Sequence, residues 1–320
     1  MHSNAKGALL ALLAFAIYAG HDVIVKFLGA SYAPFQIVFF SVLFGFPLTT
    51  LMMIRDSRPG NLRPVHPWWT LVRTLAAVMG GVSAFFAFST LPLAQTYAIL
   101  FAMPLFITLL AIPILGEKVR LRRWAAVIVG LTGVMIVLRP GTAELGIGHL
   151  AALVAAGCSA LASIIVRKIG KDERAVVLLL YPMLANFVLM GCLMPYFYEP
   201  MPLLHLGGLV AMSFMAFIAS VLVIAAYKAG EAVIVAPMQY SQILWAVFYG
   251  ALIFDEWPDS WTAVGAVIII ASGIYIVLRE SRHTTSENRP VQQTRTRIET
   301  GTLPRVSLFA NPFKRGRNGD

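Results

Sequence analysis

Four polar side chains interrupt the apolar stretch 7–28, where we predict a membrane-spanning helix. Tyr18, His21, Asp22 and Lys26 share one face of such a helix, within an arc of about 140°. A buried carboxylate beside an imidazole can bind a cationic group or exchange a proton. The competing interpretation is structural, because Asp22 and Lys26 are four residues apart and can form a local ion pair near the helix end.

A second polar face lies in the predicted helix 232–254. Gln239, Gln242, Trp245 and Tyr249 follow one another by three, three and four residues, which keeps them within about 120°. Two amides and two aromatic rings suit a flat, polar, conjugated solute, because rings stack on it and amides orient it. Interhelical hydrogen bonds and an aromatic side chain at the membrane interface would also account for these residues.

Other single residues have simpler interpretations. Pro104 and Pro237 lie inside predicted helices, where each removes a backbone hydrogen bond and is expected to kink the helix. Arg73 lies about a turn into its helix, so we interpret it as an anchor at the inner membrane interface. Glu117 and Glu256 stand at helix ends, where turn or capping roles are expected.

The sequence carries no signature of an enzyme. It lacks the HExxH, GxSxG and P-loop patterns, so neither hydrolysis nor an ATP-driven pump is indicated on this chain. Cys158 and Cys192 both lie inside apolar runs, away from any CxxC or Cys/His spacing. We therefore expect no catalytic residues, no metal and no cofactor.

The composition requires a solvent other than water. Of the 320 residues 58% are hydrophobic and 12% are charged, whereas a soluble domain has about 45–50% and about 25%. The net charge of +10 comes from short loops and a tail and not from a basic domain. Membrane lipid is therefore an expected partner, and nucleic acid is not.

The apolar runs have the length of membrane-spanning helices, about 20 residues, and are too long and too continuously apolar for barrel strands. In the short run 124–138, Ala126 and Gly130 should allow close helix packing. We predict an all-α membrane protein with ten transmembrane helices, at 7–28, 34–54, 69–91, 94–115, 124–138, 147–168, 175–197, 205–228, 232–254 and 260–278.

The loop charges predict the orientation. Positive side chains concentrate in cytoplasmic loops, and this rule is satisfied when both termini are cytoplasmic. The predicted inner loops then hold Arg55, Arg58, Arg63, Lys118, Arg120, Arg122, Arg123, Arg167, Lys168, Lys171, Arg174 and Lys228. We take 7–28 as a retained helix and not a cleaved signal. The polar tail 281–320 should be disordered and basic, either solvated or touching anionic lipid.

The chain also resembles itself at an offset of about 140 residues. The matching pairs are Val23–Gly29 with Ile164–Gly170, Gly116-Glu117 with Asp255-Glu256, and Gly133–Arg139 with Gly273–Arg279. They divide the chain into a first repeat, 1–142, and a second, 143–280. Five helices are an odd number, so the second repeat should be inverted relative to the first, as in many secondary transporters.

Several motifs resemble those of EamA-type transporters of the drug/metabolite transporter superfamily, over about residues 5–280. They are Pro92-Leu93-Ala94, Pro104-Leu105-Phe106, Leu115–Lys118, Gly130–Gly133, Ala236-Pro237, Tyr240 and Phe254–Asp259. The resemblance implies a secondary transporter. His21-Asp22-Val23, Lys26 and Asp255–Asp259 look closest to the bacterial uptake branch for S-adenosylmethionine and riboflavin.

We therefore expect a multi-pass protein of the bacterial inner membrane that moves a small organic metabolite by alternating access. Riboflavin and S-adenosylmethionine are the substrate candidates, and export of amino acids or amine-like and drug-like compounds is the alternative. A shared fold does not determine the substrate. The sequence also leaves open the direction, the coupling ion and the oligomeric state, a homodimer included.

Overall fold

Every regular element in the described part of the chain is a helix, as predicted. The computed structural model describes residues 2–54, 62–116, 121–139, 145–170, 172–230 and 235–281. The helices are α1 (His2–Gly29), α2 (Pro34–Ile54), α3 (Pro67–Thr90), α4 (Leu93–Leu100), α5 (Met103–Leu115), α6 (Leu121–Leu138), α7 (Ile147–Ile169), α8 (Ala175–Phe197), α9 (Leu203–Ala229), the 3₁₀ helix η1 (Ala236–Tyr240), α11 (Ser241–Phe254) and α12 (Ser260–Ser281).

Many of these helices are long and apolar enough to cross a membrane. Six spans meet both conditions, and shorter apolar helices cover Pro34–Leu48, Trp124–Leu138 and Ser260–Tyr275. Large apolar side chains such as Met79, Leu150 and Leu244 are exposed on the bundle, which suits contact with lipid. The chain is thus a multi-pass membrane protein, while the count of ten spans and the cytoplasmic location of both termini remain predictions.

The predicted helix 94–115 is not continuous. It ends at Leu100 and begins again at Met103, so α4 and α5 are separate helices. Between them the Ala102 N–H donates to Ile99 O at 3.0 Å, a tighter turn than the α-helix has. Pro104 explains the break, because it offers no N–H to Leu100 O and its ring crowds that carbonyl.

The predicted helix 232–254 is also divided. A 3₁₀ turn containing Pro237 precedes α11, and residues 231–234 lie outside the described part of the chain. The helices that follow the two breaks end alike, in a left-handed residue: Gly116 has φ 70° and Asp255 has φ 55°. Glycine adopts this conformation without strain, and aspartate tolerates it. The two halves of the chain thus end a helix in the same left-handed conformation with different residues.

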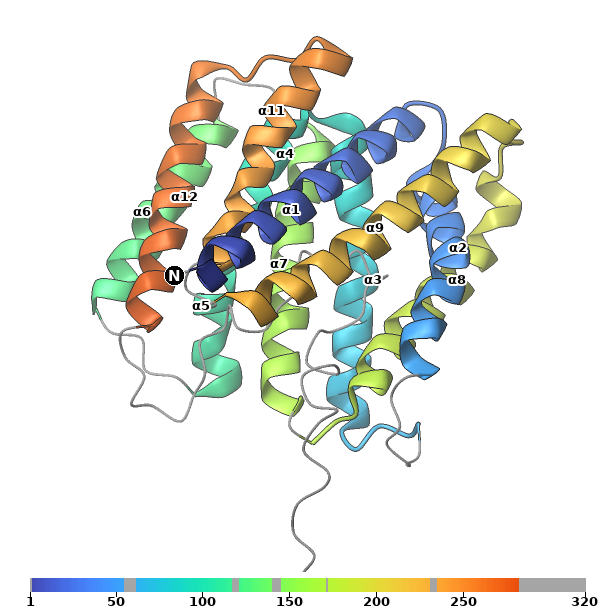
Figure 1. Cartoon of the computed structure of the whole chain (residues 1–320), viewed down its shortest axis with the longest axis horizontal. Helices are drawn as coiled ribbons and strands as arrows, with labels where there is room; N and C mark the ends of the chain where they lie inside the picture. The colour runs from blue at the N-terminus through green and yellow to red at the C-terminus, as the bar shows by residue number, and fades with distance from the viewer. Residues whose placement is uncertain are drawn as a thin grey trace, which may run out of the picture.

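Each of the main helix pairs joins one helix from the first half of the chain to one from the second half. In Figure 1, α6 lies beside α12 on one side, α2 beside α8 on the other, and α1 and α9 run together across the front, with α3 packed on α7 behind. If α1 corresponds to α7 and α3 to α9, as the sequence matches imply, the pairs α1–α9 and α3–α7 are equivalents. We call the end where α11 meets α12 the Glu256 end, and the opposite end, where α5 and α7 stop, the Lys168 end.

Small residues bring α6 and α12 unusually close together, which confirms the packing predicted for Ala126 and Gly130. A Cβ on Gly130 would lie 2.8 Å from Ser272 Oγ, whose hydroxyl donates to Ala126 O at 2.6 Å. Further along, a Cβ on Gly265 would lie 2.7 Å from Gly133 O. Backbones at this distance leave no room for a side chain on either helix.

The prediction for Arg73 was wrong. Its side chain is buried and donates through Nη1 to Leu178 O, so it connects α3 to α8 inside the bundle and does not anchor the chain at the membrane surface. A backbone carbonyl gives the guanidinium a hydrogen-bond partner within the protein. Other predicted positions lie outside the described residues, namely Arg55, Arg58, Glu117, Lys118, Arg120, Lys171 and the tail from 282 onward.

Candidate functional site

Asp22 is a buried carboxylate with partners at both oxygens. Its side chain is only 1% exposed, Oδ1 lies 2.7 Å from His21 Nδ1, and Oδ2 accepts a hydrogen bond from the Tyr97 hydroxyl. Hydrogen bonds to an ionised group are shorter and stronger than neutral ones, and burial strengthens them further. The structure therefore places a carboxylate, which can carry a negative charge, inside a mostly apolar bundle, where side chains bond both of its oxygens.

The hydrogen-bonded chain continues from the first half of the protein into the second. Gln242 Nε2 donates to the Tyr97 hydroxyl at 3.3 Å, and Gln242 is itself buried near the start of α11. We call His21, Asp22, Tyr97 and Gln242 the polar quartet. Its members come from α1, α4 and α11, and the last two helices adjoin the two breaks.

Aromatic rings fix Tyr97 in this position. The ring of Phe88 lies 5.3 Å from that of Tyr97 in an edge-on arrangement, and the ring of Phe101 lies 5.8 Å away. Phe101 in turn meets Tyr240 at 5.0 Å, which links the break after α4 to η1. The Tyr97 hydroxyl therefore points at Asp22 from a rigid, apolar frame.

Tyr97 was not among the predicted site residues. It stands 75 residues from Asp22 and 145 from Gln242, so no local spacing connects it to either. The sequence offered one indirect signal, since Tyr97 lies one turn before Phe101, where Pro104 forces the helix to break. Polar side chains beside a broken membrane helix commonly line solute sites.

Three of the seven predicted residues, His21, Asp22 and Gln242, meet in the polar quartet. Tyr18 shares α1 with His21 and Asp22, but its hydroxyl lies 2.8 Å from Ser220 Oγ on α9. The predicted continuous face 239–249 is interrupted, because Gln239 belongs to the 3₁₀ turn and not to α11.

Trp245 and Tyr249 form a stacked pair, with centroids 6.2 Å apart and planes 28° apart, and both rings are half-buried. A Cβ on Gly20 would lie 4.0 Å from the Tyr249 hydroxyl, so Tyr249 borders α1 two residues from Asp22. Tyr249 and the polar quartet thus adjoin the same level of α1 on different sides of the helix, because residues two apart point in different directions.

The local pair Asp22–Lys26 does not form. Lys26 Nζ lies 2.8 Å from Glu256 Oε1 and donates to Leu91 O at 2.7 Å. Glu256 is thus an ion-pair partner, beyond the turn or capping role expected for it. Asp22 pairs instead with its neighbour His21, which leaves the polar quartet independent of Lys26.

A comparison with protein-family models identifies the family of this chain. The model of the EamA-like transporter family matches twice, over residues 5–139 and 146–279. The chain belongs to the EamA-like transporter family. This membership favours transport over enzymatic catalysis and fits the multi-pass helical bundle.

EamA-like relatives of named function are similar over most of their length. The S-adenosylmethionine uptake transporter of Rickettsia bellii (strain RML369-C) is 27% identical, over 85% of this chain and 93% of that protein. The riboflavin transporter of Rhizobium johnstonii (strain DSM 114642 / LMG 32736 / 3841) is 27% identical, over 86% and 92%. The pseudopaline exporter of Pseudomonas aeruginosa (strain UCBPP-PA14) is 28% identical, over 84% and 94%.

The EamA-like fold is also present among solved structures. One crystal structure, of a chain 18% identical in sequence, superposes with a TM-score of 0.54 and covers 89% of this chain and 99% of that chain. At this level of identity the likeness shows the fold alone.

Proposed function

We propose that this EamA-like protein is a secondary transporter that carries a small organic metabolite across the bacterial inner membrane by alternating access. Its two repeats, 1–142 and 143–280, would be inverted relative to each other, with both termini in the cytoplasm. Two copies of one shape in opposite orientations give inward-open and outward-open states of similar energy. The proposed solute site is the polar quartet together with Trp245 and Tyr249.

The observation that carries this proposal is the position of Asp22. A carboxylate inside a membrane bundle costs about 2.5–3.5 kcal/mol on insertion scales, so a functional reason for it is the default expectation. Asp22 accepts a hydrogen bond from Tyr97, beside the break after α4, and Tyr97 in turn accepts one from Gln242, beside the break before α11. Residues from both halves of the chain thus join in one hydrogen-bonded chain that ends at Asp22, and alternating access requires such a shared site.

The chemistry of the site favours a solute that combines positive charge with a flat ring. Asp22 offers a counter-charge, and the stacked rings of Trp245 and Tyr249 offer an aromatic surface. S-adenosylmethionine has both features, and its uptake is the named function of the Rickettsia bellii relative. Riboflavin has the flat ring without the cation and is the second candidate, favoured by the Rhizobium johnstonii relative.

The direction of transport is a separate part of the proposal. We propose uptake because the Rickettsia bellii relative is named as an uptake transporter, whereas the similarly related pseudopaline protein is named as an exporter. Proteoliposomes distinguish these alternatives, because solute can be offered from either side. Export of amino acids or amine-like compounds is the corresponding alternative.

Flux into proteoliposomes tests the proposal as a whole. Purified protein should take up radiolabelled S-adenosylmethionine faster than protein-free vesicles, with riboflavin, nucleosides and amino acids tested beside it. Uptake of riboflavin but not of S-adenosylmethionine would show that the substrate is a neutral and not a cationic solute. An absence of flux for every compound, from either side and with or without a pH gradient, would overturn the proposal.

Tyr97→Phe should reduce transport of the accepted solute about ten-fold without lowering the amount of folded protein. It removes one hydrogen bond to Asp22, and bonds to charged groups contribute about 1.5–3 kcal/mol. The initial uptake rate in proteoliposomes measures this. Tyr181→Phe is the matched control, because the Tyr181 hydroxyl bonds Leu62 O at 3.4 Å, away from the polar quartet. Equal rates for both variants would contradict the role of Tyr97.

Trp245→Ala should raise the half-saturation concentration of the solute about ten-fold, because it removes one of the two stacked rings. Aromatic contacts of this kind contribute about 0.5–1.5 kcal/mol in addition to the burial of apolar area. Uptake measured over a range of solute concentrations provides the value. Trp257→Ala is the control, since Trp257 is a largely exposed residue of the α11–α12 connection. An unchanged half-saturation in Trp245→Ala would show that the ring pair only packs.

A further inference from the structure

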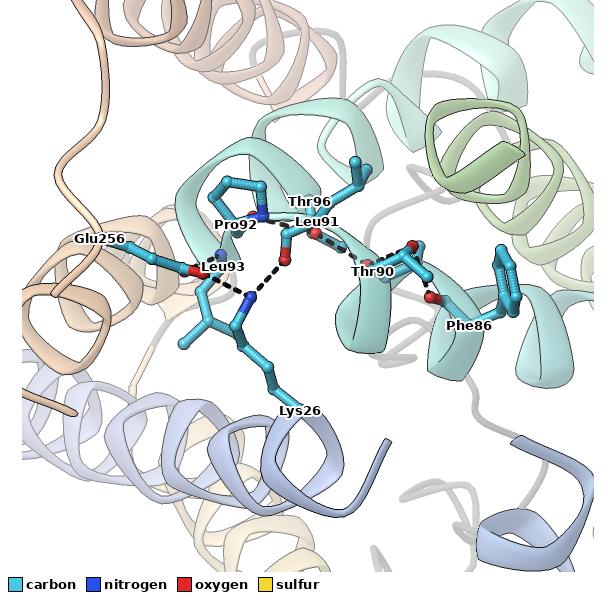
Figure 2. A network of polar contacts seen from close by, with 9 residues as sticks. Lys26, Phe86, Thr90, Leu91, Pro92, Leu93, Thr96 and Glu256 are labelled. Atoms are coloured by element: carbon cyan, nitrogen blue, oxygen red, sulfur yellow. Dashed lines mark hydrogen bonds and ion pairs between the residues drawn. The ribbon is translucent and has the colours of Figure 1, made fainter. Parts of the chain in front are cut away.

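Three segments meet at the Lys26 ammonium, near the Glu256 end. Figure 2 shows Lys26 of α1 reaching both Glu256, in the α11–α12 connection, and Leu91, between α3 and α4. Its Nζ lies 2.8 Å from Glu256 Oε1 and donates to Leu91 O at 2.7 Å. Glu256 Oε2 also accepts from Leu93 N at 3.4 Å, so the carboxylate spans α1 and the start of α4.

These contacts are stronger than those of an ordinary surface ion pair. Lys26 is 11% exposed and Glu256 is 26% exposed, and the ammonium lies 5.3 Å from the centre of the Phe254 ring. Partial burial lowers the effective dielectric and strengthens the attraction. Within the α3–α4 connection, Thr96 bonds the Pro92 carbonyl, while Lys26 is the donor to Leu91 O. Loss of Lys26 would therefore remove both an ion pair and the partner of a backbone carbonyl.

The two ends of the bundle differ where the repeats predict that they should match. At the Glu256 end α1 packs against α3, and Gly29 lies directly against Ser89. The repeat-matched helices α7 and α9 make at most isolated contacts among the described residues. The matched pairs α1–α9 and α3–α7 pack alike. At the Lys168 end, Lys168 of α7 instead donates to Ile114 O of α5 at 2.9 Å and lies 4.2 Å from the centre of the Trp69 ring of α3. The contact between α1 and α3 is therefore specific to the Glu256 end.

We propose that Lys26, Glu256 and the Leu91 carbonyl form a latch that holds the Glu256 end closed in this conformation and must open for the solute to enter from that side. The latch rests on the alternating access proposed above. Lys26 follows Asp22 by one turn of α1, so a movement of α1 that opens the latch also displaces the carboxylate of the solute site. One helix thus connects site and latch.

Thiol labelling tests the latch without any transport. In a background carrying Cys158→Ser and Cys192→Ser, Ser89→Cys introduces a reporter at the contact between α3 and Gly29. In lipid nanodiscs, Glu256→Gln and Lys26→Met should each raise the rate of maleimide labelling of this reporter about ten-fold, because the closed end opens more often. Unchanged labelling in both variants would overturn the latch, whatever solute the protein carries.

Asp259→Asn supplies the matched control. Asp259 lies at the same end and pairs with Arg139 at 2.6 Å, but this ion pair joins α6 to the start of α12, two helices packed along their length. Burial raises the pKa of Asp259, and bonds to Thr262 together with the Arg139 charge outweigh it, so the net pKa is below the usual value. Asp259 is thus charged at neutral pH. A rise in labelling equal to that of Glu256→Gln would show a general loosening and overturn the latch.

Cross-linking tests the same latch in the opposite direction. Lys26→Cys with Glu256→Cys, joined by a short cleavable bis-maleimide in the background without Cys158 and Cys192, should hold the Glu256 end closed. For a protein shown to take up S-adenosylmethionine, the cross-link should also abolish flux, and cleavage should restore it. Full flux through cross-linked protein would overturn the latch and leave the proposed function intact.

Discussion

Asp22→Asn should lower the initial rate of solute uptake at least about a hundred-fold while the protein still inserts and folds. The variant keeps the shape of the side chain but removes its charge, and it replaces an acceptor of two hydrogen bonds by a group with only one acceptor oxygen. Hydrogen bonds to charged groups contribute about 1.5–3 kcal/mol, and each 1.4 kcal/mol corresponds to ten-fold. Uptake in proteoliposomes, normalised to the amount of protein, measures the effect.

Two controls distinguish a direct role of Asp22 from a loss of charge balance. Asp172→Asn removes an exposed carboxylate that bonds His66 and should leave uptake unchanged. Adding Lys26→Met to Asp22→Asn should not restore uptake, because Lys26 pairs with Glu256 and not with Asp22. Restored uptake in the double variant would show that Asp22 serves only as a counter-charge for Lys26.

Gly265→Ala should destabilise the protein, because the contact between α6 and α12 leaves no room for a methyl group. The added carbon would lie 2.5 Å from Val137 Cγ2 and 2.7 Å from Gly133 O, and the backbone contact can be relieved only by separating α6 from α12. Forcing a methyl group into such a contact costs about 1–3 kcal/mol. The melting temperature in detergent, followed by size-exclusion chromatography after heating, should fall by several degrees.

Gly157→Ala tests whether the loss of stability comes from the α6–α12 contact or from replacing any helical glycine by alanine. Gly157 lies within α7, and a Cβ there would meet nothing within 4 Å. Since alanine favours the helix by about 1 kcal/mol over glycine, this variant should be as stable as the parent or slightly more so. Equal destabilisation by both substitutions would show that the α6–α12 contact is not the cause.

The helices could be predicted from the sequence because each apolar run faces lipid or other apolar helices along its whole length. The run 94–115 shows where this reasoning stops: its composition is mostly apolar, so hydrophobicity alone indicates one span. The break between Leu100 and Met103 arises from a missing N–H at Pro104, which was correctly expected to disturb the helix but was not expected to divide it.

The site could be predicted where polar side chains stand out in an apolar helix, as His21, Asp22 and Gln242 do. His21 and Asp22 are adjacent and stand out in an apolar helix, so their types alone identified them. Tyr97 follows Gln95 and Thr96 and does not stand out from them by type, and its role depends on packing with Phe88 and Phe101 that no local pattern encodes. The competing structural interpretation paired Lys26 with the nearest carboxylate in sequence, Asp22, whereas the fold brings Glu256, 230 residues away, to it.

The division of one span into α4 and α5 changes what the bundle can do mechanically. An unbroken helix is a rigid rod, so tilting one end outward swings the other end inward. Here α4, with 8 residues, forms a segment about 12 Å long that is joined to α5 by a short turn. Such a joint lets the segment near Leu93 move while the segment near Leu115 stays in place. We therefore expect an occluded intermediate, in which both entrances are shut around the solute, to be reached without melting any helix.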